Sequence, residues 1–254
     1  MAQFTSDGLT IAFDDSGPQR TGRCVVLVHG FTSNRLEGWR RMGWYDALER
    51  KAIRCVALDC RGHGKSDKPH EPAAYDRAAM ARDVVALMEH LGLERVDLMG
   101  YSMGARLALA VALDQPRRIG NLVLGGVGGR LLEPPTGDSR MAEAMEADDP
   151  AAIEDPMLRS FRHFADEQRE DRLALAACSR GAGAPVELAA LARLRMPVLV
   201  VVGARDNLAG NPEPLVSAIP GARAVTLPGC DHFSAIPHAL FKAAVFDFFE
   251  GYLD

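Results

Sequence analysis

Residues 96–113 read VDLMGYSMGARLALAVAL, and this stretch decides the fold. Residues 96–99 form a short apolar run typical of a strand, whereas residues 105–113 are strong helix formers. The strand therefore runs into the helix with almost no loop. Such a turn forces its central residue, Ser102, into a sparsely populated backbone conformation, and Gly100 and Gly104 let the strand and the helix approach closely. We expect the Ser102 hydroxyl to stand at the carboxyl end of a sheet, above a helix N-terminus that favours developing negative charge.

The Gly-x-Ser-x-Gly pattern also fits a tight turn whose serine only caps the following helix, so a catalytic interpretation needs partners downstream. Asp206 lies four residues past the apolar run 198–202, and His232 lies five residues past the run 222–227. Both therefore belong to loops at the same sheet edge as Ser102. A histidine that takes the serine proton and a carboxylate that orients the histidine are what this nucleophile requires. Asp231 is the alternative acid, but chain neighbours do not readily face each other, which favours Asp206.

Composition restricts the class of protein. The 254 residues are 48% hydrophobic and 25% charged, with 29 basic and 34 acidic side chains and a net charge of −5, as in an ordinary globular domain. No dense block of one charge occurs, which argues against nucleic acid or an anionic membrane as a partner. Five scattered cysteines without C-x-x-C spacing argue against a disulfide framework. The N-terminus lacks the features of a secretory signal and no apolar run could span a bilayer, so a cytoplasmic location is expected.

The order of predicted elements indicates an α/β fold. Residues 4–5 and 9–13 flank Asp7-Gly8, a two-residue hairpin signal. Apolar runs typical of buried parallel strands then alternate with helical segments, at 24–28, 53–58, 96–99, 121–124, 198–202 and 222–227. Helices are predicted around 45–51, 76–91, 105–113, 213–218 and 237–252. We therefore predict a doubly wound, mostly parallel eight-stranded sheet.

Between residue 125 and about residue 195, strand-like runs no longer alternate with helical segments. Gly128-Gly129 and Pro134-Pro135 interrupt the chain, and short amphipathic helices are predicted at 142–146, 157–167, 170–177 and 186–194. A helical insertion at the sheet edge that carries Ser102 is most simply a lid over a pocket. The predicted division is a core of residues 1–127 and 196–254, with a small helical lid of residues 128–195 inserted after the sixth strand.

Four ordered stretches together resemble the α/β-hydrolase family. They are HGF at 29–31, DCRGHGKSD at 59–67, GYSMG at 100–104 and GCDHF at 229–233. The resemblance implies a triad of Ser102, Asp206 and His232, with an oxyanion hole formed by the backbone N–H groups of Phe31 and Met103. It implies a serine hydrolase, of carboxylesterase or lactonase type, that cleaves a small carboxylic ester or lactone without a cofactor. A monomer and a homodimer are both left open.

Residues outside the triad are expected to shape the pocket. The lid residues Leu158, Phe161 and Phe164 are expected to roof it, and Phe233 to contact substrate. Arg106, one helical turn after Ser102, is either half of a structural ion pair or an anchor for a substrate carboxylate. The sequence Ser-Met-Gly-Ala-Arg is similar to the corresponding turn of the menaquinone-pathway synthases of this fold, which suggests a triad-based lyase as an alternative. A ligand receptor with vestigial hydrolysis is the third hypothesis.

The remaining histidines are given structural roles. His29 is interpreted as a buried, hydrogen-bonded support. No His, Cys or Asp spacing suggests a metal site. Surface or lid positions are expected for His63, His70, His90, His163 and His238.

Overall fold

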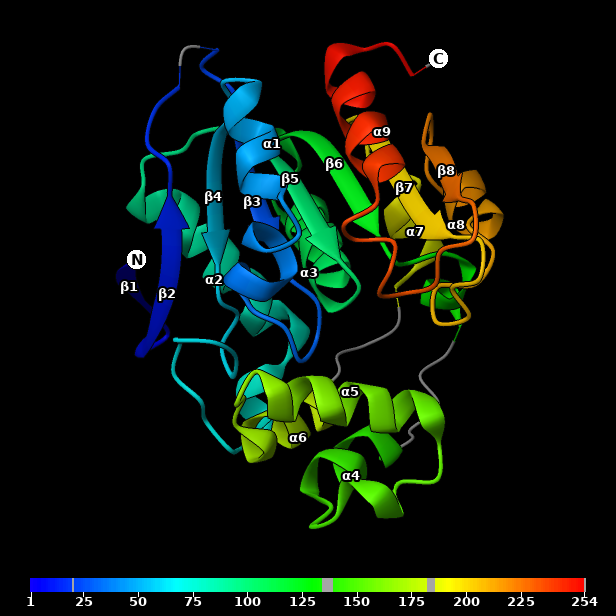
Figure 1. Cartoon of the computed structure of the whole chain (residues 1–254). Helices are drawn as coiled ribbons and strands as arrows, with labels where there is room; N and C mark the ends of the chain where they lie inside the picture. The colour runs from blue at the N-terminus through cyan, green and yellow to red at the C-terminus, as the bar shows by residue number, and fades with distance from the viewer. Residues whose placement is uncertain (20, 134–138, 182–185, 254) are drawn as a thin grey trace.

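The computed structural model describes residues 1–19, 21–133, 139–181 and 186–253. Within these ranges, eight strands form one sheet in the order β1-β2-β4-β3-β5-β6-β7-β8 (Figure 1). The strands are β1 (Ala2–Ser6), β2 (Leu9–Asp15), β3 (Cys24–Val28), β4 (Arg54–Leu58), β5 (Val96–Tyr101), β6 (Ile119–Gly125), β7 (Val198–Gly203) and β8 (Arg223–Leu227). The helices are α1 (Trp44–Arg50), α2 (Arg77–His90), α3 (Met103–Asp114), α4 (Arg140–Glu146), α5 (Pro156–Glu167), α6 (Arg172–Arg180), α7 (Leu188–Leu191), α8 (Glu213–Ala218) and α9 (Ala239–Glu250).

The sheet is doubly wound and mostly parallel, as the sequence predicts. Strand β1 pairs antiparallel with β2, and β2 pairs antiparallel with β4, whereas the other neighbours run parallel. The hairpin turns at Asp7 and Gly8, which both have positive φ (48° and 78°), as a type I′ turn requires. The expected hairpin is therefore confirmed.

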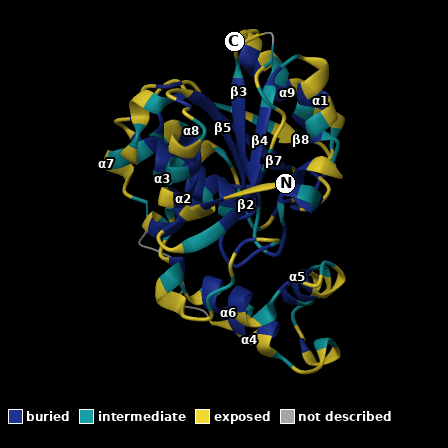
Figure 2. Cartoon of the chain, turned by 90° about the vertical axis from the view of Figure 1, so that its left-hand side faces the viewer, coloured by how far each residue is buried: buried dark blue, intermediate teal, exposed yellow. Residues whose placement is uncertain are grey.

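The central strands are buried on both faces because helices cover both sides of the sheet (Figure 2). Alternate side chains of β3 show this clearly. Val26 packs in the cluster that contains residues of α2, α3 and α8, and Leu27 packs in the cluster that contains residues of α1 and α9. This two-sided burial explains why the parallel strands read as continuous apolar runs rather than as an alternating pattern.

The turn between β5 and α3 has the predicted strain. Ser102 adopts φ 53° and ψ −112°. A Cβ atom at Gly100 would lie 2.1 Å from the carbonyl oxygen of Gly104, and one at Gly104 would lie 2.0 Å from the carbonyl oxygen of Val28. Carbon and oxygen atoms that are not bonded cannot approach this closely, so no residue with a Cβ fits at either position. The two glycines are therefore required for the close packing of β3, β5 and α3.

Helices α4 to α7 lie between β6 and β7 in the chain. Figure 1 places α4, α5 and α6 at the end of the sheet toward which the parallel strands point. Residues 134–138, which include Pro134-Pro135, and residues 182–185 belong to the expected insertion but lie outside the described residues. The helix predicted at 186–194 is shorter in the structure, where α7 covers only Leu188–Leu191. The other three helices agree with their predicted positions to within a few residues.

The turn between α5 and α6 is attached to the core by two carboxylates. Glu170 is buried and accepts hydrogen bonds from Asn34 Nδ2 (2.9 Å) and from the backbone N–H of Gly64 (2.8 Å). Burial raises the pKa of Glu170 above its ordinary value. The next residue, Asp171, lies 3.0 Å from His70 Nε2 at an exposed position. These contacts join the turn to the loops that follow β3 and β4.

Across the described ranges, no helix is both long enough and apolar enough to cross a lipid bilayer.

Candidate active site

A hydroxyl, an imidazole and a carboxylate lie in one hydrogen-bonded line at the carboxyl edge of the sheet. Ser102 Oγ lies 2.9 Å from His232 Nε2, and His232 Nδ1 lies 2.8 Å from Asp206 Oδ2. The three residues come from the loops after β5, β7 and β8, which are far apart in the sequence. The parallel order of these strands brings the three loops together. In this arrangement Nδ1–H donates to Asp206, and the free Nε2 lone pair accepts the Ser102 hydroxyl proton.

The carboxylate of Asp206 is fixed by the backbone that follows it. Its side chain is 0% exposed. Oδ1 accepts hydrogen bonds from the N–H groups of Leu208 (3.0 Å) and Ala209 (2.9 Å), so Oδ2 is left to face His232. The alternative acid, Asp231, instead accepts from the N–H groups of Phe233 and Ser234 and so holds its own loop. The structure therefore pairs His232 with Asp206.

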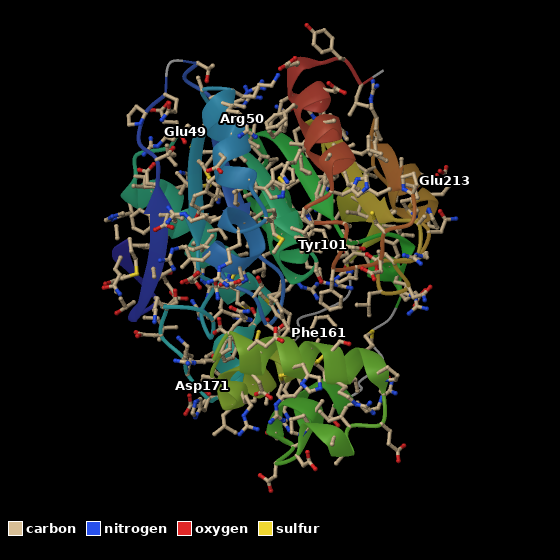
Figure 3. All side chains as sticks on the ribbon, in the orientation of Figure 1. Glu49, Arg50, Tyr101, Phe161, Asp171 and Glu213 are labelled. Carbon is tan, nitrogen blue, oxygen red and sulfur yellow. The ribbon has the colours of Figure 1, made fainter. Side chains whose placement is uncertain are left out.

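Tyr101 connects the strand before the nucleophile to the loop of the histidine. Its hydroxyl donates a 2.5 Å hydrogen bond to the backbone carbonyl of His232. Burial raises the pKa of Tyr101 well above its ordinary value, which keeps the hydroxyl protonated and able to donate. The Tyr101 ring also lies 5.4 Å from the His232 ring. This contact supports the imidazole from the side of the sheet, and Figure 3 marks Tyr101 at the end of the sheet that faces α5.

The two expected oxyanion donors lie on either side of Ser102. Phe31 follows β3, and Met103 is the first residue of α3. Gly30 packs directly on the turn: a Cβ at Gly30 would lie 3.5 Å from Ser102 Cβ, so the Phe31 segment lies close to the nucleophile. Neither the Phe31 N–H nor the Met103 N–H donates a hydrogen bond to another described residue.

His29 supports this segment from inside, as expected. Its Nδ1–H donates to the carbonyl of Gly30 (2.8 Å), and its Nε2 accepts the N–H of Cys60 (2.9 Å). The ring is 0% exposed, and burial lowers the pKa of His29 to about 4. The imidazole is therefore neutral at physiological pH, with its tautomer set by two backbone groups.

The surface position expected for His63 is wrong. His63 is 0% exposed, and its Nδ1–H donates to the carbonyl of Arg61 (3.0 Å). Its Nε2 has no hydrogen-bond partner among the described residues. Burial, aided by the neighbouring His29, lowers the pKa of His63 to about 3. The ring packs edge-on against Phe31 at 5.8 Å, so His63 fills space behind the segment that carries Phe31 rather than contacting solvent.

Two cavities lined by described residues open beside the nucleophile, and both are bordered by Ser102, His232, Phe31 and Phe161. The first cavity has a volume of about 400 Å³ and the second about 270 Å³. Phe161 lies on the side of α5 that faces the sheet (Figure 3), with its ring 5.2 Å from Phe233 and 6.2 Å from Phe31. Phe161 therefore divides the space above Ser102 into two arms.

The first cavity has aromatic walls and a partly acidic lining. Of the expected substrate residues, Phe161, Phe164 and Phe233 line it. Sequence reasoning missed several of its other wall residues, which come from the segment after β3 and from the outer part of α5. These are Ser33, Glu37, Trp39, Met42, Ser160, His163 and Glu167. Part of this wall belongs to a π-helix at Leu36–Arg40, for which apolar periodicity gives no signal.

The second cavity contains two guanidinium groups. Arg106 lines it together with Met103, as does Arg77 of α2, which sequence reasoning did not select. Among the residues that the structure describes, Arg106 has no hydrogen bond or ion-pair partner, so the expected structural ion pair is not seen there. Burial, and to a smaller extent Arg77, lowers the pKa of Arg106. A partly buried guanidinium remains charged, and here it faces a cavity that contains the nucleophile.

One expected substrate residue is placed elsewhere. Leu158 is not part of the lining of either cavity, and it packs instead with Ala144 and Ile153 in a cluster inside the helical insertion. The cause is helical geometry, because Leu158 lies on the side of α5 that meets α4. Within the described ranges, no group of three or more His, Cys, Asp or Glu residues could hold a metal ion.

Comparison with known proteins identifies the family. A family model described as "alpha/beta hydrolase fold" matches residues 23–182. A 2-hydroxy-6-oxononadienedioate/2-hydroxy-6-oxononatrienedioate hydrolase of Pseudomonas putida is 27% identical over 267 residues, which cover 95% of this chain and 92% of that protein. A Bacillus subtilis protein with the provisional name 2-succinyl-6-hydroxy-2,4-cyclohexadiene-1-carboxylate synthase is 36% identical over 119 residues. That match covers 47% of this chain and only 41% of the length of the Bacillus subtilis protein.

Solved structures agree with the sequence comparisons. The enol-lactonase from Burkholderia xenovorans LB400 superposes with a TM-score of 0.80 at 25% identity, over 98% of this chain and 100% of that chain. The family match covers more than half of the chain, and the sheet order and the strained turn at Ser102 are in place. The chain belongs to the α/β hydrolase fold family.

Proposed function

We propose that the chain is a serine hydrolase that cleaves a small carboxylic ester or lactone through an acyl-enzyme. The observation that carries the proposal is the continuous line from Ser102 Oγ through both ring nitrogens of His232 to Asp206 Oδ2, with distances of 2.9 and 2.8 Å. A serine in this setting is activated because the imidazole can take its proton as the new bond forms. Similarity to an enol-lactonase and to a 2-hydroxy-6-oxononadienedioate/2-hydroxy-6-oxononatrienedioate hydrolase supports a hydrolytic reaction.

In the proposed mechanism, Ser102 Oγ attacks the substrate carbonyl while His232 Nε2 accepts the hydroxyl proton. The carbonyl oxygen becomes an oxyanion that takes hydrogen bonds from the N–H groups of Phe31 and Met103, each typically worth about 3–4 kcal/mol of barrier. The imidazolium, stabilised by Asp206, then returns the proton to the leaving alkoxide. Water, deprotonated by the same imidazole, attacks the acyl-enzyme and releases the acid and Ser102.

The helical insertion of residues 128–195 is proposed to act as a lid on a core of residues 1–127 and 196–254. Phe161 and Phe164 extend from it over the first cavity. A cover of this kind excludes water and strengthens the interactions of the oxyanion with its donors. We also propose a cytoplasmic setting, which is supported by the five cysteines, all of them buried free thiols.

The direct test is Ser102→Ala, measured on a panel of esters and lactones and with a fluorophosphonate probe. The variant is expected to lose at least about 10³-fold in kcat and all covalent labelling. Ser160→Ala is the matched control, because Ser160 also lines the first cavity but donates its hydroxyl to the carbonyl of Pro156. It should retain labelling. Full esterase turnover by Ser102→Ala would refute the mechanism.

A second candidate function is a lyase that uses the same three residues to abstract a proton while Arg106 holds a substrate carboxylate. The specific observation in its favour is the guanidinium of Arg106, which faces the second cavity without a partner among the described residues. The partial similarity to the Bacillus subtilis synthase points the same way. Elimination activity that is lost in Arg106→Gln, in a protein that forms no acyl adduct, would favour the lyase over the hydrolase.

A further inference from the structure

The two cavities beside Ser102 carry opposite charges. Among their described lining residues, the charged groups of the first cavity are the carboxylates Glu37 and Glu167, whereas those of the second are the guanidinium groups of Arg77 and Arg106. The first cavity lining contains no Arg or Lys, and the second contains no Asp or Glu, within the part of the chain that the structure describes. The nucleophile therefore lies at the boundary between an anionic arm and a cationic arm.

Glu37 is held in the wall of the first cavity by the local backbone. Asn34 Oδ1 accepts the N–H groups of both Leu36 and Glu37, which fixes the start of the π-helical turn. The Glu37 side chain is only 10% exposed, and its Oε2 pairs with Arg41 NH1 at 2.9 Å. The Arg41 side chain is 68% exposed and lies outside the cavity lining, so Glu37 is the member of this pair that faces the first cavity.

Glu167 adds a second negative charge at the rim. It is exposed and lies four residues after His163 on the face of α5 that also carries Phe164. His29, which also lines this cavity, is buried, and burial lowers its pKa to about 4, so its ring carries no positive charge at neutral pH. An anionic group that enters the first cavity meets two carboxylates and several aromatic rings. An apolar or uncharged group meets mainly the rings.

We propose that Glu37 and Glu167 determine specificity by excluding a second negative charge, so that the substrate carries a carboxylate at one end only. The charged end lies beside Arg106 in the second cavity, and the uncharged end lies in the first cavity. This inference rests on the proposed hydrolase function, because the bond that is cleaved must lie at Ser102 between the two arms. Like charges placed together at a binding site raise the free energy of the complex enough to reject the wrong substrate without any steric clash.

The test uses four 4-nitrophenyl esters with different charge patterns. They are 4-nitrophenyl butyrate (neutral), 4-nitrophenyl hydrogen glutarate (acid on the acyl side), 3-carboxy-4-nitrophenyl butyrate (acid on the alcohol side) and 3-carboxy-4-nitrophenyl hydrogen glutarate (both). Whichever way round the diacid binds, one carboxylate must enter the first cavity. We expect kcat/KM for the diacid to be about tenfold or more below that for the better monoacid.

The variants then identify the residues responsible. In a Glu37→Gln, Glu167→Gln double variant, the ratio of diacid to monoacid kcat/KM should rise about three- to tenfold. Intrinsic leaving-group reactivity cancels, because each protein is compared on the same esters. In Arg106→Gln, kcat/KM for the better monoacid should no longer exceed kcat/KM for the neutral ester. Glu154→Gln is the matched control, because it removes an exposed lid carboxylate that lines neither cavity, and it should leave the diacid ratio unchanged.

Failure of this inference can be told apart from failure of the proposed function. If the esters are cleaved in a Ser102-dependent way but the wild type accepts the diacid as well as the better monoacid, the inference is overturned. An unchanged ratio in the double variant would also overturn it. If no ester is cleaved, the proposed function fails, and the charge pattern is then tested by titration calorimetry. Uncleavable amide analogues of the monoacid should bind Ser102→Ala at least about tenfold more tightly than those of the diacid, and equal affinities would refute the inference.

Discussion

Replacing Asp206 by Asn should nearly abolish catalysis while leaving the fold intact. The structure settles how the new amide must sit. Two backbone N–H groups, from Leu208 and Ala209, donate to Oδ1 at 3.0 and 2.9 Å, so the amide oxygen must stay there. The amide nitrogen then faces His232 Nδ1, where the carboxylate oxygen lies at 2.8 Å in the wild type. Because an NH₂ group can only donate, Nδ1 must become the acceptor and the proton must move to Nε2.

This tautomer cannot accept the proton of Ser102, because Nε2–H now points at the hydroxyl oxygen. In serine proteases of this mechanism the corresponding change lowers kcat about 10⁴-fold, which corresponds to about 5 kcal/mol of transition-state stabilisation. We expect a loss of the same order here, since the Asp206 side chain is 0% exposed and no water can replace the carboxylate.

The assay is steady-state hydrolysis of a 4-nitrophenyl ester, with thermal unfolding measured in parallel. The expected result is a drop in kcat of at least about 10³-fold with a Tm close to that of the wild type. Asp231→Asn is the matched control. The Asp231 carboxylate adjoins the histidine in sequence but accepts from Phe233 and Ser234, which an amide oxygen can also do, so activity should stay near wild type. The reasoning would be refuted if kcat dropped only in Asp231→Asn. It would also be refuted if Asp206→Asn kept more than about a tenth of the wild-type kcat.

Three further predictions concern the fold around the site. Gly104→Ala should yield little folded protein in expression and circular-dichroism measurements, because its Cβ would lie 2.0 Å from the Val28 carbonyl oxygen; a well-folded variant would contradict this. Burial lowers the pKa of His29 to about 4, whereas its pKa in the unfolded chain is about 6.5. The contribution of neutral His29 to the free energy of unfolding is therefore fully present above pH 6.5 and is lost as the pH falls toward 4. In urea unfolding, His29 should account for a decrease of about 3 kcal/mol in the free energy of unfolding between pH 7 and pH 4. A free energy of unfolding that does not change over this pH range would contradict the prediction. Glu170→Ala should raise the rate of amide hydrogen exchange in α5 about tenfold while α3 is unchanged, because two hydrogen bonds from the core to the Glu170 carboxylate are lost. Equal protection of α5 in both proteins would contradict the attachment.

The sheet, and the convergence of Ser102, His232 and Asp206 at one edge of it, can be predicted because they depend on strong local signals. Continuous apolar runs mark strands that are buried on both faces, and the glycines beside Ser102 mark a turn where backbones touch. Asp206 and His232 could be selected because loops after parallel strands share one edge of the sheet. His63 was misplaced for a related reason: a polar ring after a strand resembles a surface residue, and only the tertiary packing shows that it is enclosed between His29 and Phe31.

The residues that line the two cavities are harder to predict from the sequence than the sheet, because their positions depend on tertiary packing. Leu158 and Phe161 lie three residues apart on one amphipathic helix, yet Leu158 packs inside the helical insertion and Phe161 divides the two cavities. Periodicity identifies an apolar face but not the partner that the face meets. Glu37 gives no signal because a charged residue outside any apolar periodicity is expected in a solvent-exposed loop, whereas the structure buries it in a π-helical turn. The proposed chemistry therefore follows from the sheet, whereas the choice of substrate depends on how an inserted segment docks onto it. Substitutions at Glu37, Arg106 or Glu167 should accordingly change which esters are cleaved more than they change the line from Ser102 to Asp206.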